Sequence, residues 1–281
     1  MNAQQLRKRI YDAIPEGTVI PQHDQEGHKY FIVPLGEQFL SVTTKLAVIK
    51  YPSIQNWKMN KALDYVSRNW RSIDEHTIMD IIDAAAKAPV EEFEGAGSVG
   101  TEIHECRERY FKEWIRLGAR PQSTLDFIPA DQRDTRIVSA MRALESFCIK
   151  ENYEPIATEL YVYSAKLKIA GTLDDIGLLP FKTSSGRTGK RLVLMDIKTS
   201  NQAIKISYAY QVALYYGMFK RLTGLIPKKS FILHLSKQDG TYKIPEIRQI
   251  SKVFKAACNV LKVYDSEEFV KKMIEKPALI I

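Results

Sequence analysis

The stretch "RLVLMDIKTSNQAIKISYAYQVALYYGMF", residues 191–219, begins with an apolar run that ends in an acid and a base. Residues 191–198 predict a buried strand, and residues 207–222 predict the helix that follows it. Because side chains alternate along a strand, Asp196 and Lys198 point to the same face. Unpaired buried charges are costly, so the two residues predict a salt bridge, a surface edge or a reaction site.

A second acidic strand precedes this one. The segment "AGTLDDIG", residues 170–177, places Asp174 and Asp175 inside an otherwise apolar strand, where aspartate is unfavourable. If the two strands are neighbours, Asp174 and Asp196 converge, and a divalent cation would relieve the repulsion between them. Carboxylate oxygens suit Mg²⁺ or Mn²⁺. Lys198 would then orient or deprotonate the attacking water, or neutralise charge.

The spacing of apolar residues separates a helical first half of the chain from a second half of strands and helices. Residues 29–48 predict one or two short strands, whereas residues 53–153 are mainly helical, with a loop at 118–132. This order of elements implies an α/β or α+β domain. Further strands are expected at 156–164 and 167–179, with a strand pair at 230–244 and helices at 251–264 and 266–275.

Composition limits the function classes. The chain has 41 basic and 33 acidic residues, a net charge of +8 that favours a polyanionic partner. Its three cysteines, Cys106, Cys148 and Cys258, form no C-x-x-C pair, which argues against a disulfide framework and a four-cysteine metal site. No run of about 18 apolar residues is present, so we expect a soluble, cytoplasmic protein that does not engage a membrane.

Two motif matches are rejected on their context. The segment "GAGSVG", residues 95–100, fits G-x-G-x-x-G but follows the acidic segment "APVEEFE" instead of a strand, so it does not predict a dinucleotide site. The segment "HECRE", residues 104–108, ends in Glu where H-E-x-x-H requires His, so a zinc protease is not predicted.

Four motifs in order carry a family resemblance. They are "GTEIH" at 100–104, "GTLD" at 171–174, "DIK" at 196–198 and "QVALY" at 211–215. With these motifs the chain resembles the PD-(D/E)XK nuclease superfamily and, within it, the RecB-like exonuclease branch. The resemblance is strong over residues 155–220, and the His104 segment near 100–117 lies outside that part.

The resemblance implies a fold. The expected fold is an α/β restriction-endonuclease-like core, in which helices flank a central mixed sheet. In this chain a largely helical N-terminal region would precede the core. We expect residues 1–153 to form this mainly helical region, including the His104 helix, and to pack on the core. Residues 154–281 would supply the core sheet and the C-terminal helices, so that both regions form one integrated domain.

The resemblance also implies a set of site residues. One or two Mg²⁺ or Mn²⁺ ions would be bound by His104, Asp174, Asp196 and the backbone carbonyl of Ile197. Asp174, Asp196 and Lys198 would be the catalytic residues. Gln211 and Tyr215 would position the nucleic-acid backbone and the lysine. The iron–sulfur variants of the family need four cysteines, so no such cluster is expected.

Each of these residues also has a structural interpretation. His104 lies on a helix with an apolar face, and only the G-x-x-D spacing selects Asp174 over Asp175. Gln211 and Tyr215 are one turn apart and, together with Tyr208, fit an ordinary packing stripe. Glu159 is a further acid near the site, and we expect it to be solvated or paired.

A basic segment supports a phosphate-bearing substrate. The segment "PFKTSSGRTGKR", residues 180–191, contains no acid and is expected to form a hairpin loop near the metal site, or else a solvated turn. Its cations are the remaining predicted DNA contacts: Lys182, Arg187, Lys190 and Arg191.

The sequence therefore predicts a Mg²⁺- or Mn²⁺-dependent deoxyribonuclease, an exonuclease that hydrolyses DNA ends or single strands. The chain resembles phage-encoded proteins, which would act in the host cytoplasm, with a recombination or replication protein as a further partner. Two alternatives stay open. One is a nuclease fold that binds DNA without cutting it, and the other is an endonuclease with the same site.

Overall fold

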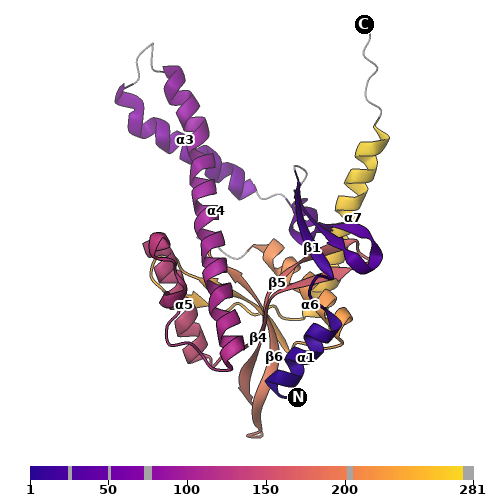
Figure 1. Ribbon diagram of the computed structural model, residues 1–281. Helices are drawn as coiled ribbons and strands as arrows, with labels where there is room; N and C mark the ends of the chain where they lie inside the picture. The colour runs from indigo at the N-terminus through magenta and orange to yellow at the C-terminus, as the bar shows by residue number, and fades with distance from the viewer. Residues whose placement is uncertain (25–26, 50–51, 73–77, 201–204, 275–281) are drawn as a thin grey trace. The chain divides into compact units, whose positions relative to one another are not determined.

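The computed structural model describes residues 1–24, 27–49, 52–72, 78–200 and 205–274 (Figure 1). The chain divides into two compact units. The first unit comprises Met1–Ile49 with Glu105–Ile281, and the second comprises Lys50–His104. The boundary falls inside the long helix α4 (Ile78–Leu117), directly after His104.

Within the first unit, the described residues form one eight-stranded sheet in the order β1-β2-β3-β5-β6-β7-β8, with β4 paired to β5. The pairs β3–β5 and β6–β7 are parallel and the other pairs are antiparallel, so the sheet is mixed, as the sequence predicts. The strands are β1 Val19–Asp24, β2 Gly27–Ile32, β3 Glu37–Ser41, β4 Glu154–Ser164, β5 Ile169–Lys182, β6 Thr188–Lys198, β7 Lys229–Leu235 and β8 Tyr242–Lys243.

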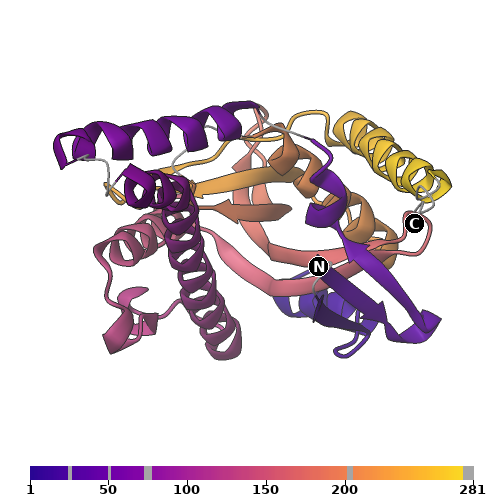
Figure 2. The ribbon, with the colours of Figure 1, turned by 90° about the horizontal axis from the view of Figure 1, so that it is seen from above.

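Helices cover both faces of this sheet (Figures 1 and 2). On one face, α1, α2, α6 and α7 bury a continuous apolar cluster against the strands. On the other face, Phe147 of α5 contacts Phe231 of β7, and Phe111 of α4 contacts Tyr153. The protein is therefore an α/β protein with a central sheet. The helices are α1 Ala3–Ala13, α2 Val42–Leu46, α5 Thr135–Lys150, α6 Ile206–Thr223 and α7 Ile250–Met273.

The strand β5 has an interrupted edge. One of its edges pairs with β4 along most of its length. The other edge pairs with β3 through Ile169 and Ala170, and with β6 only from Asp175 onward. Residues 171–174 therefore lie between two ladders, where no strand among the described residues pairs with that edge of β5. This interruption is where the predicted acidic motif lies.

The N-terminal region is not largely helical, which corrects the expectation from the sequence. The three strands β1, β2 and β3 extend the sheet of the first unit. Val19, Ile32 and Phe39, one from each of these strands, are buried and form a cluster with Ala170 of β5. The sequence indicated strand structure only from residue 29, because Pro21 and the polar residues after it hide the alternation in β1.

The second unit is helical in its described residues. It contains α3 (Pro52–Asn69), a 3₁₀ turn (Trp70–Ser72) and α4 up to His104. The helix α4 continues through Pro89 and through residues 95–100. The G-x-G-x-x-G match is thus inside a helix, where it cannot form a phosphate-binding loop. Among the described helices, none has the length and apolar character needed to cross a membrane.

Candidate functional site

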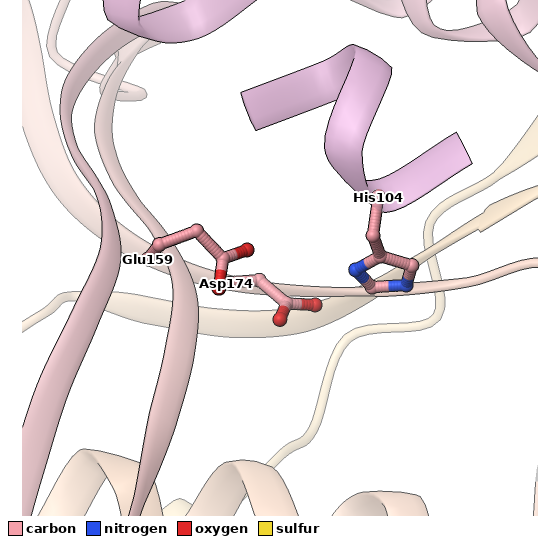
Figure 3. Close-up of side chains that lie close together, drawn as sticks. All are labelled: His104, Glu159 and Asp174. Atoms are coloured by element: carbon pink, nitrogen blue, oxygen red, sulfur yellow. The ribbon is translucent and has the colours of Figure 1, made fainter. Parts of the chain in front are cut away.

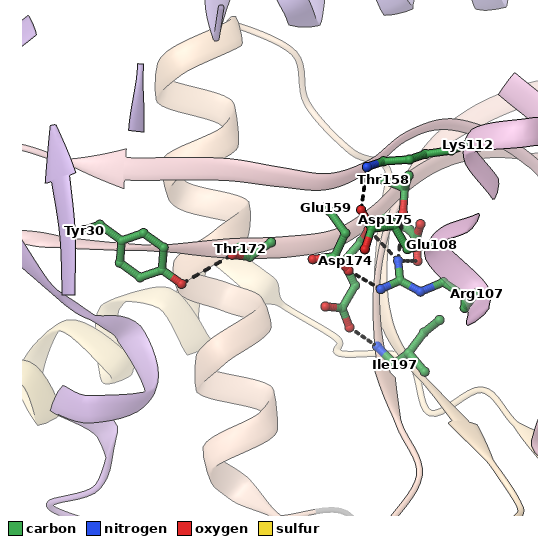
Figure 4. A network of polar contacts seen from close by, with 10 residues as sticks. All are labelled: Tyr30, Arg107, Glu108, Lys112, Thr158, Glu159, Thr172, Asp174, Asp175 and Ile197. Atoms are coloured by element: carbon green, nitrogen blue, oxygen red, sulfur yellow. Dashed lines mark hydrogen bonds and ion pairs between the residues drawn. The ribbon is translucent and has the colours of Figure 1, made fainter. Parts of the chain in front are cut away.

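The two predicted aspartates lie on neighbouring strands. β5 and β6 are antiparallel, and Asp175 pairs with Met195 at the end of their ladder. The next step of this register sets Asp174 opposite Asp196. Asp174 is buried, and its Oδ2 accepts a hydrogen bond from the backbone N–H of Ile197 at 2.6 Å (Figure 4). The Asp174 carboxylate thus bridges to β6 just beyond the last ladder pair.

Asp196 and Lys198 share one face of β6. The Lys198 Nζ lies 2.6 Å from Oδ2 of Asp196, whose side chain is 1% exposed. The other oxygen, Oδ1, is buried and has no hydrogen-bond partner among the described residues. Such an orphaned oxygen is costly in a folded protein unless a ligand satisfies it.

Burial raises the pKa of Asp196 to about 7, and the nearby charge of Asp174 adds to this rise while Lys198 opposes it. Burial acts in the opposite sense on Lys198, but the two carboxylates prevail and raise the pKa of the ammonium group. Lys198 therefore carries its charge at neutral pH, whereas Asp196 exchanges a proton there. The acid and the base form an electrostatically coupled pair.

Three potential metal ligands lie close together, and Asp174 is one of them. His104 of α4, Glu159 of β4 and Asp174 of β5 each offer one ligand atom, and these atoms lie within 4.8 Å of one another (Figure 3). Two members of this group, His104 and Asp174, are predicted metal ligands. Asp196 is not a member of it. The third member is instead Glu159, which the sequence did not favour as a functional residue.

Glu159 owes its place to an unusual backbone. Its neighbours Thr158 and Leu160 pair with Asp175 and Leu173, so Glu159 lies opposite Asp174. Its φ of 50° is in the left-handed region, which is rare for a residue other than glycine and costs of the order of 1 kcal/mol or more. Conformations of this kind concentrate at functional sites. No local sequence pattern identifies such a residue, because the conformation is imposed by the tertiary structure.

Arg107 organises the acids of this region. It is fully buried and donates to Thr158 Oγ1 at 2.8 Å, to the backbone carbonyl of Asp174 at 3.0 Å and to Asp175 Oδ2 at 2.9 Å (Figure 4). It also forms an ion pair with Glu159. Asp175 is thereby committed to a structural ion pair on the face toward α4, and Asp174 is the member of the Asp-Asp pair that remains for the site. In the sequence, the only feature that could have indicated a role for Arg107 at the site is its position one helical turn after His104.

Gln211 and Tyr215 act as a pair on α6. Gln211 Nε2 donates to the Tyr215 hydroxyl at 3.2 Å, and Tyr215 is 4% exposed. The Tyr215 ring lies against Gly171, at the interrupted edge of β5: a Cβ atom at Gly171 would lie 2.8 Å from Cε1 of the ring. Tyr215 is therefore part of the core as well as a neighbour of the G-x-x-D strand. The glycine of that motif makes room for the ring.

Replacing Gly171 with alanine is expected to destabilise the protein by about 1–3 kcal/mol, since the buried Tyr215 ring must move to admit the methyl group. Urea unfolding would measure the change. Gly97→Ala is the matched control, because among the described residues no atom beyond the local helix backbone and the adjoining residues lies within 4 Å of a Cβ at this position. Alanine should be neutral or stabilising at Gly97. Equal effects at the two positions would contradict the close contact.

The basic segment forms a hairpin, but its tip is remote from the acids. Lys182 and Thr188 close the β5–β6 ladder, and Lys190 forms an ion pair with Glu154 at 2.5 Å. Lys182 is eight residues beyond Asp174 on the same strand, roughly 26 Å at about 3.3 Å per residue. The structure thus does not bring Lys182, Arg187, Lys190 and Arg191 to the site, because both strands run on past it.

The raised pKa of Asp196 predicts a pH-dependent stability. The folded pKa of about 7 lies above the unfolded value near 3.9, so the folded state binds the extra proton between these values and the free energy of unfolding falls as pH rises from one to the other. From pH 5 to pH 8 without metal, we expect the wild type to lose roughly 2–3 kcal/mol relative to Asp196→Asn. Urea unfolding in a chelator measures this difference, and a difference that is constant with pH would contradict it.

Comparison of the chain with protein-family models and with curated proteins finds no match. Among solved structures, the chain is similar to one described as "Crystal structure of SSO0001". The sequence identity is 16%, the TM-score is 0.24, and the match covers 58% of this chain and 74% of that chain. A likeness at this level carries no argument about function, so the functional assignment depends on the side chains of this chain.

Proposed function

We propose that the protein is a metal-dependent DNA nuclease with a restriction-endonuclease-like core, of the RecB-like branch of the PD-(D/E)XK superfamily. Its expected activity is exonucleolytic hydrolysis of DNA ends or single strands. The observation that carries the proposal is the coupled group on β5 and β6, in which two buried aspartates meet beside a charged lysine. Burying so many charges costs free energy, which favours a site that binds a ligand over a purely structural group.

The donors at the site fit a hard divalent cation. Asp174 and Glu159 offer carboxylate oxygens and His104 offers a ring nitrogen. Asp196 offers a buried oxygen that has no hydrogen-bond partner in the described part of the chain. This mixture, dominated by oxygen, suits Mg²⁺ or Mn²⁺. When bound, the cation would supply Lewis-acid stabilisation and lower the pKa of a water nucleophile. The participation of the Ile197 carbonyl stays a prediction.

The protein residues have separable roles in this proposal. Lys198 keeps its proton at neutral pH because Asp196 and Asp174 raise its pKa. It is therefore suited to donate hydrogen bonds to the attacking water or to a phosphate oxygen, and to offset the negative charge that develops in the transition state. Asp196 holds this ammonium group in place. Gln211 and Tyr215 support the neighbouring part of β5 and stay predicted contacts of the nucleic-acid backbone.

Cleavage assays with defined substrates would test the function. Purified protein is incubated with Mg²⁺, Mn²⁺ or a chelator and with linear single-stranded DNA, linear duplex DNA, RNA or covalently closed circular DNA. We expect the linear DNA to be degraded with either metal and the closed circle to survive. Asp174→Asn, which keeps the shape of the side chain, should be inactive in every mixture.

The same assays separate the alternatives. Nicked or linearised circles would indicate an endonuclease, because an exonuclease cannot start on a closed circle. Retention of DNA in a gel-shift assay without cleavage under either metal would indicate a DNA-binding scaffold. Degradation of RNA alone would change the substrate class. Activity that is unchanged by Asp174→Asn would overturn the proposed site.

A further inference from the structure

The surroundings of Lys198 contain one group that neither the motifs nor the metal site accounts for. The ring centroid of Tyr208, on the first turn of α6, lies 5.1 Å from the Nζ of Lys198. A second ammonium group, that of Lys205, lies 5.9 Å from the same ring. Distances below about 6 Å place both cations within range of attraction by the aromatic face.

The Tyr208 ring is linked through its hydroxyl to Ser200, two residues after the end of β6. Its hydroxyl donates to Ser200 Oγ at 3.5 Å, and the backbone carbonyl of Ser200 lies 2.6 Å from Nε2 of His234 on β7. His234 is the parallel partner of Lys198 in the β6–β7 ladder. The ring is thus linked to Ser200, and Ser200 is linked to the strand that pairs with β6 at Lys198.

The chemistry of the lysine explains why a ring is useful there. The side chain of Lys198 is 18% exposed, and its four-carbon stem is flexible in the absence of packing. Its ion pair with Asp196 fixes one side of the ammonium group. An aromatic face on a second side restricts the group without removing a hydrogen-bond donor, so that a donor remains for a phosphate or a water.

We propose that Tyr208 is a positioning residue, whose ring holds the Lys198 ammonium group against Asp196 and toward the reacting phosphate. The role of Tyr208 in catalysis rests on the proposed function. The contact between the Tyr208 ring and Lys198 does not depend on it. Tyr208 itself is not assigned a contact with the substrate. The ring provides the effect, so phenylalanine should replace tyrosine and an aliphatic residue should not.

The kinetic test compares Tyr208→Phe and Tyr208→Leu in the DNA cleavage assay. We expect Tyr208→Phe to keep the wild-type kcat within about twofold and Tyr208→Leu to lose roughly 10-fold or more, with KM little changed, because only the aromatic face attracts and orients the ammonium group. Tyr210→Leu, on the same helix and also packed on the core, is the matched control for a purely structural loss.

The second readout does not need activity. In protein labelled with ¹³C at the lysine ε-carbon, the resonance of Lys198 is identified by its absence in Lys198→Arg. An aromatic ring at this distance shifts the attached protons upfield. We expect this shift in the wild type and in Tyr208→Phe, and its loss in Tyr208→Leu but not in Tyr210→Leu.

The outcomes are distinguishable. If the protein cleaves no DNA but the ring-current shift depends on Tyr208, the proposed function fails and the positioning contact stands. If DNA is cleaved and Tyr208→Leu keeps both the wild-type kcat and the Lys198 resonance, the positioning role is overturned and the nuclease assignment stands. A loss of activity in Tyr208→Phe equal to that in Tyr208→Leu would also overturn it, since the hydroxyl would then be the group that matters.

Discussion

Replacing Lys198 with alanine is expected to lower the rate of DNA hydrolysis by about 10²- to 10³-fold or more, with folding and most of the DNA affinity retained. The physical reason is that a preoriented positive charge, held 2.6 Å from Asp196, stabilises the transition state more than the bound substrate. An alanine side chain can neither donate to the phosphate nor orient a water. The measurement is kcat and KM on labelled linear DNA, together with a gel-shift titration.

Two controls make this result specific. Lys198→Met keeps most of the volume of the stem without the charge and should be as inactive as the alanine variant. Lys190→Ala removes another lysine from β6, one that is half exposed and paired with Glu154, and should leave kcat unchanged. A Lys198→Ala variant that turns over at the wild-type rate would remove the proposed mechanism, whatever its affinity for DNA.

Replacing Arg107 with alanine is expected to lower the free energy of unfolding by about 3–5 kcal/mol. The guanidinium group is fully buried, and its loss leaves the carboxylate of Asp175 inside the protein without a counter-ion. It also removes the donor to the Asp174 carbonyl and the partner of Glu159. Urea or thermal unfolding at neutral pH measures the effect.

A nearby arginine provides the comparison. Arg109 lies two residues further along α4, is 44% exposed and forms a 3.9 Å pair with Glu105. Arg109→Ala should change stability by no more than about 0.5 kcal/mol. Because Arg107→Ala is expected to be marginally folded, the double variant Arg107→Met/Asp175→Asn is informative: it should recover part of the loss, since the fully buried carboxylate of Asp175 is then absent. A cost of Arg107→Ala below about 1 kcal/mol would contradict the organising role.

Local patterns in the sequence determined much of the fold. Apolar alternation located β4, β5 and β6 within a few residues, and the helical spacing located α6. The strand pair expected at 230–244 also has a local cause, since glycine suits the φ of 68° that position 240 adopts between β7 and β8. The same period of two placed Asp196 and Lys198 on one face. These features depend on residues close in sequence, so a short window contains their cause.

The composition of the site depended on contacts between distant segments. The choice between Asp174 and Asp175 was resolved by Arg107, which is 68 residues away from Asp175 in the chain and takes it into a buried ion pair. No local sequence pattern predicts the left-handed backbone of Glu159 or the pairing of β3 with β5. The distance between the basic hairpin and the acids also depends on the register of β5 and β6, which the sequence does not give. Sequence alone thus determined which side chains carry charge and which face of their strand they occupy. Only the tertiary structure decided which charges meet, because burial makes each unpaired charge costly and the partners that offset this cost come from other parts of the chain.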